Sequence, residues 1–401
     1  MSGALEDVVV LDLTTDYSAA LAAAMLGDFG ARVVRIDERG GGPSGRARPE
    51  DLDSEARWNY RDELIHRNKR SLALDLARAP GVEILKGLVA VVDVLVSDWP
   101  ADRLATLELD AESVTSRWPR LIYARSSGFG PEGPDRDLPA IDELAAARTG
   151  MMPILPQPDQ PPVYPGSGPM YTAVMLALGV LMALHHRAES GEGQAVDVSL
   201  LGGNMYGASL DLQAYLAIGG DRLCKPVSRL DAGNPMSGVL YPAADGRWIA
   251  LTMPDTDRWW PGLAQIVDLD VADPRFATHE LRCEKNRLEL IQVLGERFRQ
   301  KPSTHWKVEL TRHQLSADVI EEFDYPAKDP QVFRNHYVLD LDHPSAGRVK
   351  TLGFPIYMSE SPARLERLAP CVGQHSAEIL RELLGYSETR IGELEESGVI
   401  A

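Results

Sequence analysis

The hydrophobic positions in the first part of the chain fall into short apolar runs separated by helical segments. The runs are rich in Val, Leu and Ile and cover residues 8–13, 31–36, 71–76, 91–96 and 121–126. Between them, residues 19–29 and 81–89 carry apolar side chains at helical spacing. Strands that alternate with helices usually pair in parallel, because each helix carries the chain back across the sheet. The pattern predicts an α/β fold with a doubly wound, Rossmann-like sheet.

A longer apolar segment covers residues 170–186 and contains no charge until Arg187. This pattern predicts a helix that is buried on most faces and is too short and too interrupted to span a membrane. Pro169 suits the first turn, where its missing N–H costs nothing. A turn at 189–193 and an alternating run at 194–200 predict a strand after this helix. Helix N-termini leave backbone N–H groups free for an anion or an acyl oxygen, so the start of this helix is a candidate site.

The composition of the chain shifts near residues 219–225. A predicted hairpin at 241–252 and three predicted helices follow, at 259–267, 285–298 and 304–312. We therefore expect a smaller α+β domain at residues 220–330. Residues 1–219 and 331–401 are expected to form the large α/β domain.

Charge and cysteine usage narrow the classes of function. The chain has 401 residues and a net charge of −18, which disfavours nucleic acid as a partner because nucleic-acid-binding proteins present basic faces. Its three cysteines lie far apart, and the adjacent His185 and His186 point in different directions on a helix, so no metal site is expected. The N-terminus has no basic region and starts a strand at once, which predicts a cytoplasmic protein.

Several motifs carry a resemblance to a known family. In residues 183–200, an Ala-Leu pair, Arg187, a Gly-Glu-Gly-Gln turn and a Val-Asp-Val-Ser-Leu run follow one another. Further motifs lie at residues 10–14, 26–37, 67–75, 127–134, 273–278, 329–332, 369–375 and 384–386. In this order they resemble the class III CoA-transferase family, which also contains the α-methylacyl-CoA racemases. The resemblance implies coenzyme A and acyl-CoA as substrates and two chains wound through each other into an interlocked dimer.

The chain departs from this family at the nucleophile. Transferases of the family carry an aspartate at the start of the long apolar helix, and the matching position here is Pro169. No Asp or Glu lies between Gln160 and Glu189. Proline has no group that attacks a thioester or carries a proton. In the racemase branch a histidine precedes the aspartate that matches Asp142, whereas this chain has Ile141 there. Both proton carriers of the racemases, at positions 141 and 169, are therefore missing, and racemisation is not expected.

Two nearby carboxylates, Asp142 and Glu143, are candidate substitutes for the missing nucleophile. Asp142 is also explained more simply as a cap of the helix that follows it. The resemblance implies an acyl site close to Asp16, Tyr17, Gly168 and Pro169. The residues expected to contact coenzyme A are Arg39, Arg70, Leu74, Arg78 and Arg103.

Three functions remain open at this point. The chain is a non-catalytic CoA-transferase subunit that works with a homologous, Asp-bearing partner in a heterodimer or heterotetramer, as in benzylsuccinate CoA-transferase. Alternatively, it is an active homodimeric transferase with a displaced carboxylate, or an acyl-CoA binding protein without catalysis. We favour the first, with a small carboxylic acid and an acyl-CoA as substrates and with neither a membrane nor nucleic acid as partner.

Overall fold

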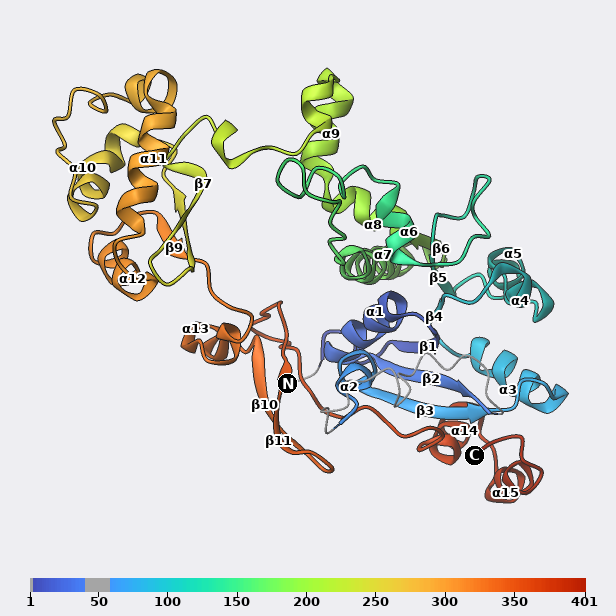
Figure 1. Cartoon of the computed structure of the whole chain (residues 1–401). Coiled ribbons are helices and arrows are strands. Elements are labelled where there is room, and N and C mark those ends of the chain that lie inside the picture. The colour runs from blue at the N-terminus through green and yellow to red at the C-terminus, as the bar shows by residue number, and fades with distance from the viewer. Residues whose placement is uncertain (1–2, 40–57) are drawn as a thin grey trace. The chain divides into compact units, whose positions relative to one another are not determined.

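The computed structural model describes residues 3–39 and 58–401 (Figure 1). The chain divides into two compact units. The first comprises residues 1–151, 164–218 and 330–401, and the second comprises residues 152–163 and 219–329. The proline-rich segment 152–163 therefore belongs to the same unit as residues 219–329.

A six-stranded sheet organises the first unit, and all of its strand pairs are parallel. The strand order is β3-β2-β1-β4-β5-β6. The strands are β1 (Val9–Leu13), β2 (Arg32–Glu38), β3 (Lys69–Leu74), β4 (Val94–Ser97), β5 (Ile122–Ser127) and β6 (Ala195–Ser199). The predicted α/β fold with a parallel sheet is confirmed. The order reverses between β1 and β4, and the carboxyl ends of the two strands at such a reversal are where open parallel sheets usually bind a ligand.

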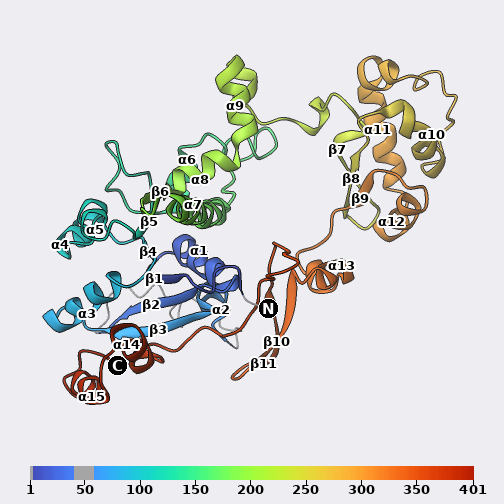
Figure 2. The ribbon, with the colours of Figure 1, turned by 180° about the vertical axis from the view of Figure 1, so that it is seen from behind.

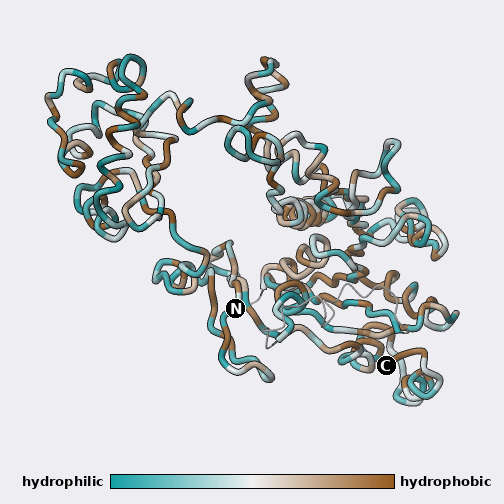
Figure 3. The backbone as a smooth tube through the Cα atoms, viewed as in Figure 1, coloured by the Kyte–Doolittle hydropathy of each residue, from teal (hydrophilic) through white to brown (hydrophobic). Residues whose placement is uncertain are grey.

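Both faces of this sheet are covered, as the continuous apolar runs of its strands require. Leu11 and Leu13 face a core that includes residues of α3 (Ala79–Val89), α14 (Ser376–Leu384) and α15 (Glu388–Glu396). Val10 faces the opposite core, which includes α1 (Tyr17–Asp28) and α7 (Gly168–Ser190). Figure 2 shows α14 beside β3 from behind, and Figure 3 shows much of the sheet in hydrophobic colours.

The remaining elements of the first unit are short. They are α2 (Tyr60–His66), α4 (Ala101–Thr106), α5 (Ala111–Arg117), α6 (Asp142–Ala147), α8 (Leu200–Gly207), α9 (Ser209–Ile218), α13 (Pro330–Arg334) and an antiparallel pair, β10 (Val338–His343) and β11 (Gly347–Leu352). The helix α9 has no buried residue.

The helix α7 is longer than its sequence pattern predicts. It has 23 residues, because the polar stretch after Arg187 continues the helix until Gly191 ends it in the left-handed conformation at φ 80°. The expectation that this segment is too short to span a membrane is wrong, since its length and composition would allow a crossing. A core helix of a globular protein meets the same criteria, and α7 packs against α1, α8, β5 and β6.

The second unit is built around a three-stranded antiparallel sheet with the order β7-β8-β9. Its strands are β7 (Ser237–Pro242), β8 (Trp248–Thr252) and β9 (Ala317–Val319). The helices α10 (Thr256–Ile266), α11 (Arg287–Phe298) and α12 (Ser303–Arg312) share a hydrophobic core with this sheet. The predicted hairpin is formed by β7 and β8, and its first strand begins earlier than expected.

Candidate functional site

The start of α7 presents glycine and proline where an acidic side chain would be needed for nucleophilic catalysis. Ser167 is the N-cap residue, but its side chain makes no capping hydrogen bond. Gly168 is buried and Pro169 lies in the first turn, as predicted. No acidic residue lies in that turn. The helix itself therefore offers no carboxylate to a substrate at this end.

A carboxylate from another element lies against this helix start. Asn204 Nδ2, on α8, donates to Asp142 Oδ1 at 2.7 Å, and the Tyr164 hydroxyl donates to Asp142 Oδ2. A Cβ atom on Gly168 would lie 2.1 Å from Asp142 Oδ1 and 2.2 Å from Asn204 Nδ2. A side chain at position 168 would therefore require Asp142 or Asn204 to move. The structure thus brings Asp142 next to Gly168, although the two residues are 26 positions apart in the sequence.

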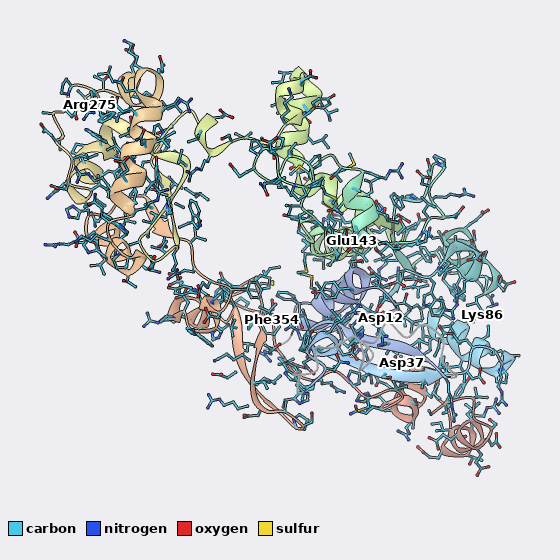
Figure 4. All side chains as sticks on the ribbon, viewed as in Figure 1. Asp12, Asp37, Lys86, Glu143, Arg275 and Phe354 are labelled. Carbon is cyan, nitrogen blue, oxygen red and sulfur yellow. The ribbon has the colours of Figure 1, made fainter. Side chains whose placement is uncertain are left out.

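The hydrogen bonds of Asp142 define its role. The expectation that Asp142 caps α6 is wrong, because the N-cap of that helix is Ile141 and no side chain caps it. Both carboxylate oxygens instead accept hydrogen bonds from Asn204 and Tyr164. Burial raises the pKa of Tyr164, and its hydrogen bond to Asp142 raises it further, so the hydroxyl remains a donor. Glu143 lies exposed on the same helix (Figure 4).

The loop between β1 and α1 meets the residue that follows β4. Thr15 N lies 2.8 Å from each carboxylate oxygen of Asp98, and Thr15 Oγ1 donates to Oδ1 at 2.9 Å. Asp16 N donates to Asp98 Oδ2 at 2.5 Å. Burial raises the pKa of Asp98 to about 7, although the bonds from the Asp16 and Thr15 backbone oppose this shift. Asp98 therefore lies in the crevice between β1 and β4 and occupies the donors of the neighbouring loop.

Asp16 and Tyr17 connect this loop to the helices around it. The Asp16 carboxylate caps α1 by accepting from Ser18 N at 3.0 Å. The Tyr17 hydroxyl lies 3.5 Å from Met170 Sδ, in the first turn of α7. Burial raises the pKa of Tyr17, so its hydroxyl is a proton donor at neutral pH. The four residues expected near an acyl site, Asp16, Tyr17, Gly168 and Pro169, thus belong to adjoining segments.

A buried ion pair lies behind this loop, on the α1 face of the sheet. Lys69 Nζ donates to Asp12 Oδ2 at 2.6 Å and to the carbonyl of Ala20 at 2.8 Å, and both charged side chains are fully buried. Thr14 donates to the other Asp12 oxygen through its N–H and its hydroxyl. Burial lowers the pKa of Lys69 to about 8. Figure 4 labels Asp12 on β1 and Asp37, which pairs with Arg35, on β2.

Two of the residues expected to contact coenzyme A donate to carbonyl groups at the end of the chain. The Arg39 guanidinium donates to the carbonyl of Ile400, and Arg78 donates to the carbonyl of Ser397 at 2.5 Å. Leu74, a third expected contact, pairs through its backbone with Ile400. These three residues therefore lie together beside the carboxyl ends of β2 and β3.

The other two expected contacts differ in position. Arg103 stacks on Trp99, with its guanidinium carbon 3.8 Å from the ring centroid, and pairs with Glu38 at 2.7 Å. Glu38 ends β2, so Arg103 lies at the same edge as Leu74. Arg70 lies at the opposite end of β3 and pairs with Glu378 at 2.9 Å and with Glu382. The structure does not bring Arg70 together with the others.

Sequence reasoning missed Asn204 and Tyr164 as partners of Asp142, and Thr15 as a partner of Asp98. A signal for Asp98 was present, because it is an acidic residue that follows a predicted strand of a parallel sheet, where ligands of such sheets bind. Asn204 gives no comparable signal. Within residues 3–39 and 58–401, no group of three or more His, Cys, Asp or Glu side chains could hold a metal ion.

Comparisons with known proteins agree with this architecture. The model of CoA-transferase family III matches residues 5–376. The chain is 29% identical to succinyl-CoA:glutarate CoA-transferase of Homo sapiens, over 99% of this chain and 90% of that protein. It is 30% identical to succinyl-CoA–D-citramalate CoA-transferase of Chloroflexus aurantiacus, over 99% and 98%. The crystal structure of a CAIB/BAIF family protein from Brucella suis superposes with a TM-score of 0.81 at 26% identity, covering 96% of this chain and 100% of that one.

Proposed function

The chain belongs to CoA-transferase family III, and from that premise we propose that it is a transferase subunit without a nucleophile of its own. Its partner would be a homologous chain that carries the aspartate at the start of the long apolar helix. The substrates would be an acyl-CoA and a small carboxylic acid. The observation that carries the proposal is the first turn of α7, where Gly168 and Pro169 provide no carboxylate.

The state of Asp142 supports the proposal. A carboxylate attacks a thioester through a free lone pair, and hydrogen bonds to the ionised form reduce its availability. Both oxygens of Asp142 accept such bonds, from Asn204 and Tyr164. The closest carboxylate to the helix start is therefore committed to holding α6, α8 and Tyr164 together.

Exposed apolar side chains support a second chain as partner. On α9, Leu210 is 82% exposed and Leu216 is 69% exposed, and α7 leaves Leu178 at 52% and Met182 at 59%. Large apolar side chains left exposed on two helices are typical of places where another molecule binds. An interlocked heterodimer or heterotetramer would cover such residues.

The test is co-expression of this chain with an Asp-bearing homologue, followed by separation by size and a CoA-transfer assay. We would use succinyl-CoA as donor and glutarate as acceptor, the pair named for one relative. The expected result is a stable heteromer that transfers CoA, while this chain alone does not. Replacing the partner's aspartate by asparagine should abolish transfer. A homodimer of this chain that transfers CoA on its own would contradict the proposal.

A second candidate function rests on the position of Asp142 against Gly168. In that case Asp142 is a displaced nucleophile and the chain is active as a homodimer. Incubation with succinyl-CoA and hydroxylamine, followed by mass spectrometry, should then convert Asp142 into a hydroxamate. Asp142→Asn should remove both the label and the activity, while Glu143→Gln, on the neighbouring exposed residue, should change neither. Binding of CoA by a homodimer without any transfer would favour an acyl-CoA binding protein.

A further inference from the structure

We propose that Asp98 makes the crevice between β1 and β4 of this chain exclude anionic oxygens, so that no phosphate or carboxylate of a substrate binds there. This inference rests on the proposed function and deepens it. Asp98, which is remote in sequence from Pro169, would be the residue that prevents a substrate from binding at this end of the sheet. The chain would then contribute scaffold and interface, while the anionic parts of the substrates bind elsewhere.

The position of Asp98 is where an open parallel sheet normally binds its ligand. Ligands of such sheets lie outside the carboxyl ends of the strands, at the point where the strand order reverses. In this chain the reversal lies between β1 and β4. Thr15 and Asp16 follow β1, and Asp98 directly follows β4.

Three hydrogen-bond donors of the loop after β1 are already occupied by Asp98. Successive backbone N–H groups that converge on one point form a small anion-binding concavity. The N–H groups of Thr15 and Asp16 converge in this way, and the anion that they hold is the Asp98 carboxylate. The Thr15 hydroxyl adds a third donor to the same group. A substrate oxygen would have to displace the side chain before it could use any of them.

Charge adds to this steric exclusion. Neither Asp98 nor Asp16 has an ion pair within the part of the chain that the structure describes. Two cations of neighbouring elements are engaged elsewhere, since Lys69 pairs with Asp12 and Arg103 pairs with Glu38. A second negative charge beside an ionised carboxylate is disfavoured. Charge repulsion by Asp98 therefore disfavours a second anion here, in addition to the loss of the donors that Asp98 already occupies.

The substitution that tests this role is Asp98→Asn. The amide oxygen still accepts hydrogen bonds from the Thr15 and Asp16 backbone. These bonds are weaker than those to the carboxylate, because the side chain no longer carries a charge. Asp102→Asn is the matched control, because Asp102 is exposed on α4 and its removal changes the net charge equally. Asp98→Ser is a second variant, whose short side chain cannot reach every donor.

The measurement is calorimetric titration of the full-length chain with CoA at pH 8, after circular dichroism has shown which variants are folded. We expect the dissociation constant for CoA to fall at least tenfold in Asp98→Asn or Asp98→Ser, and to stay unchanged in Asp102→Asn. Pantetheine, which shares the thiol arm but has no phosphates, should show no gain. A parallel titration with succinate distinguishes a carboxylate from a phosphate as the excluded group.

The inference is overturned if a folded Asp98 variant binds neither CoA nor succinate more tightly than the unmodified chain does. It is also overturned if Asp102→Asn or pantetheine shows the same gain. The outcome is independent of the partner experiment, because binding to the single chain requires no transfer. CoA transfer by this chain alone would contradict the proposed function, whereas the role of Asp98 is decided by the CoA and succinate titrations alone.

Discussion

Asp12 and Asp98 lie at the same end of the large sheet, but the protein holds these two carboxylates in different ways. Asp12 is fully buried and is neutralised by Lys69 at 2.6 Å. Asp98 is partly buried and is held by the N–H groups of Thr15 and Asp16 and by the Thr15 hydroxyl, and none of the described residues forms an ion pair with it. A buried ion pair cannot lose one partner without leaving an uncompensated charge. A carboxylate held by dipoles can be replaced by an amide, so only the second arrangement is easily changed.

The largest effect should come from breaking the ion pair. Lys69→Met leaves the Asp12 carboxylate buried without its cation and should lower the free energy of unfolding by about 3–5 kcal/mol, measured by urea denaturation. Lys86→Met is the control, because the pair that Lys86 forms with Glu108 lies at the surface and should be worth less than about 1 kcal/mol. Equal losses in the two variants would show that burial does not distinguish the pairs.

The second effect depends on pH and concerns Asp98. Burial raises its pKa from 3.8 to about 7, so the folded state binds this proton more tightly than the unfolded state does. The resulting stabilisation is fully present below about pH 4 and is lost as the pH rises through 7, and Asp98→Asn lacks this dependence. The unfolding free energy of Asp98→Asn relative to the unmodified chain should therefore rise by about 2–4 kcal/mol between pH 4 and pH 8. If the difference in unfolding free energy between the two proteins stayed constant from pH 4 to pH 8, the pKa of Asp98 would not be raised by folding.

A smaller effect should follow from removing one of the donors to Asp98. Thr15→Val deletes the hydroxyl that donates at 2.9 Å and should cost about 1.5–3 kcal/mol at pH 8, since the acceptor is charged. The same change at Thr115, whose hydroxyl donates to a helix carbonyl at 2.7 Å, should cost about 1 kcal/mol or less. Denaturation curves of both variants at pH 8 make the comparison. A smaller loss at Thr15 than at Thr115 would argue against an ionised Asp98.

The smallest effect concerns Glu38, the third carboxylate at this edge of the sheet. Its partner Arg103 also stacks on Trp99. Arg103→Lys keeps the charge but loses the planar stacking group, and should lower the unfolding free energy by about 0.5–1 kcal/mol. Both variants would be compared by thermal melts. Arg117→Lys is the control, because Arg117 is exposed and its guanidinium carbon lies 5.0 Å from the Trp118 ring centroid, and it should leave the melting temperature almost unchanged. If the two variants melt at the same temperature, the stacking of Arg103 on Trp99 does not contribute measurably to stability.

The sequence predicts the sheet well, because its strands are buried on both faces and read as continuous apolar runs. It also predicts the start of α7 at Pro169, since proline and glycine mark helix starts through backbone geometry alone. It does not predict the end of α7, where polar residues 187–190 continue the helix until Gly191. Propensity is a weak signal at helix ends, and the fold decides where the last turn lies.

The contacts of the candidate site are beyond sequence reasoning for a different reason. Asp98 meets Thr15 across 83 residues, and Asp142 meets Asn204 across 62. Each contact depends on the directions in which two separate loops or helices leave the sheet, and side-chain spacing along one element says nothing about this. The same holds for Arg70, which shares β3 with Leu74 but lies at its other end.

The crowding around Gly168 restricts the routes by which this chain could regain a nucleophile. In a library randomised at positions 168 and 169 and selected for transferase activity, acidic residues should be recovered at 169 and not at 168. A side chain at 168 would require Asp142 or Asn204 to move, because its Cβ would lie 2.1 Å and 2.2 Å from their polar atoms, whereas position 169 already carries a side chain. A single substitution at 169 would then be enough to restore an acidic side chain to this helix start, whereas a substitution at 168 would also require two polar neighbours to rearrange.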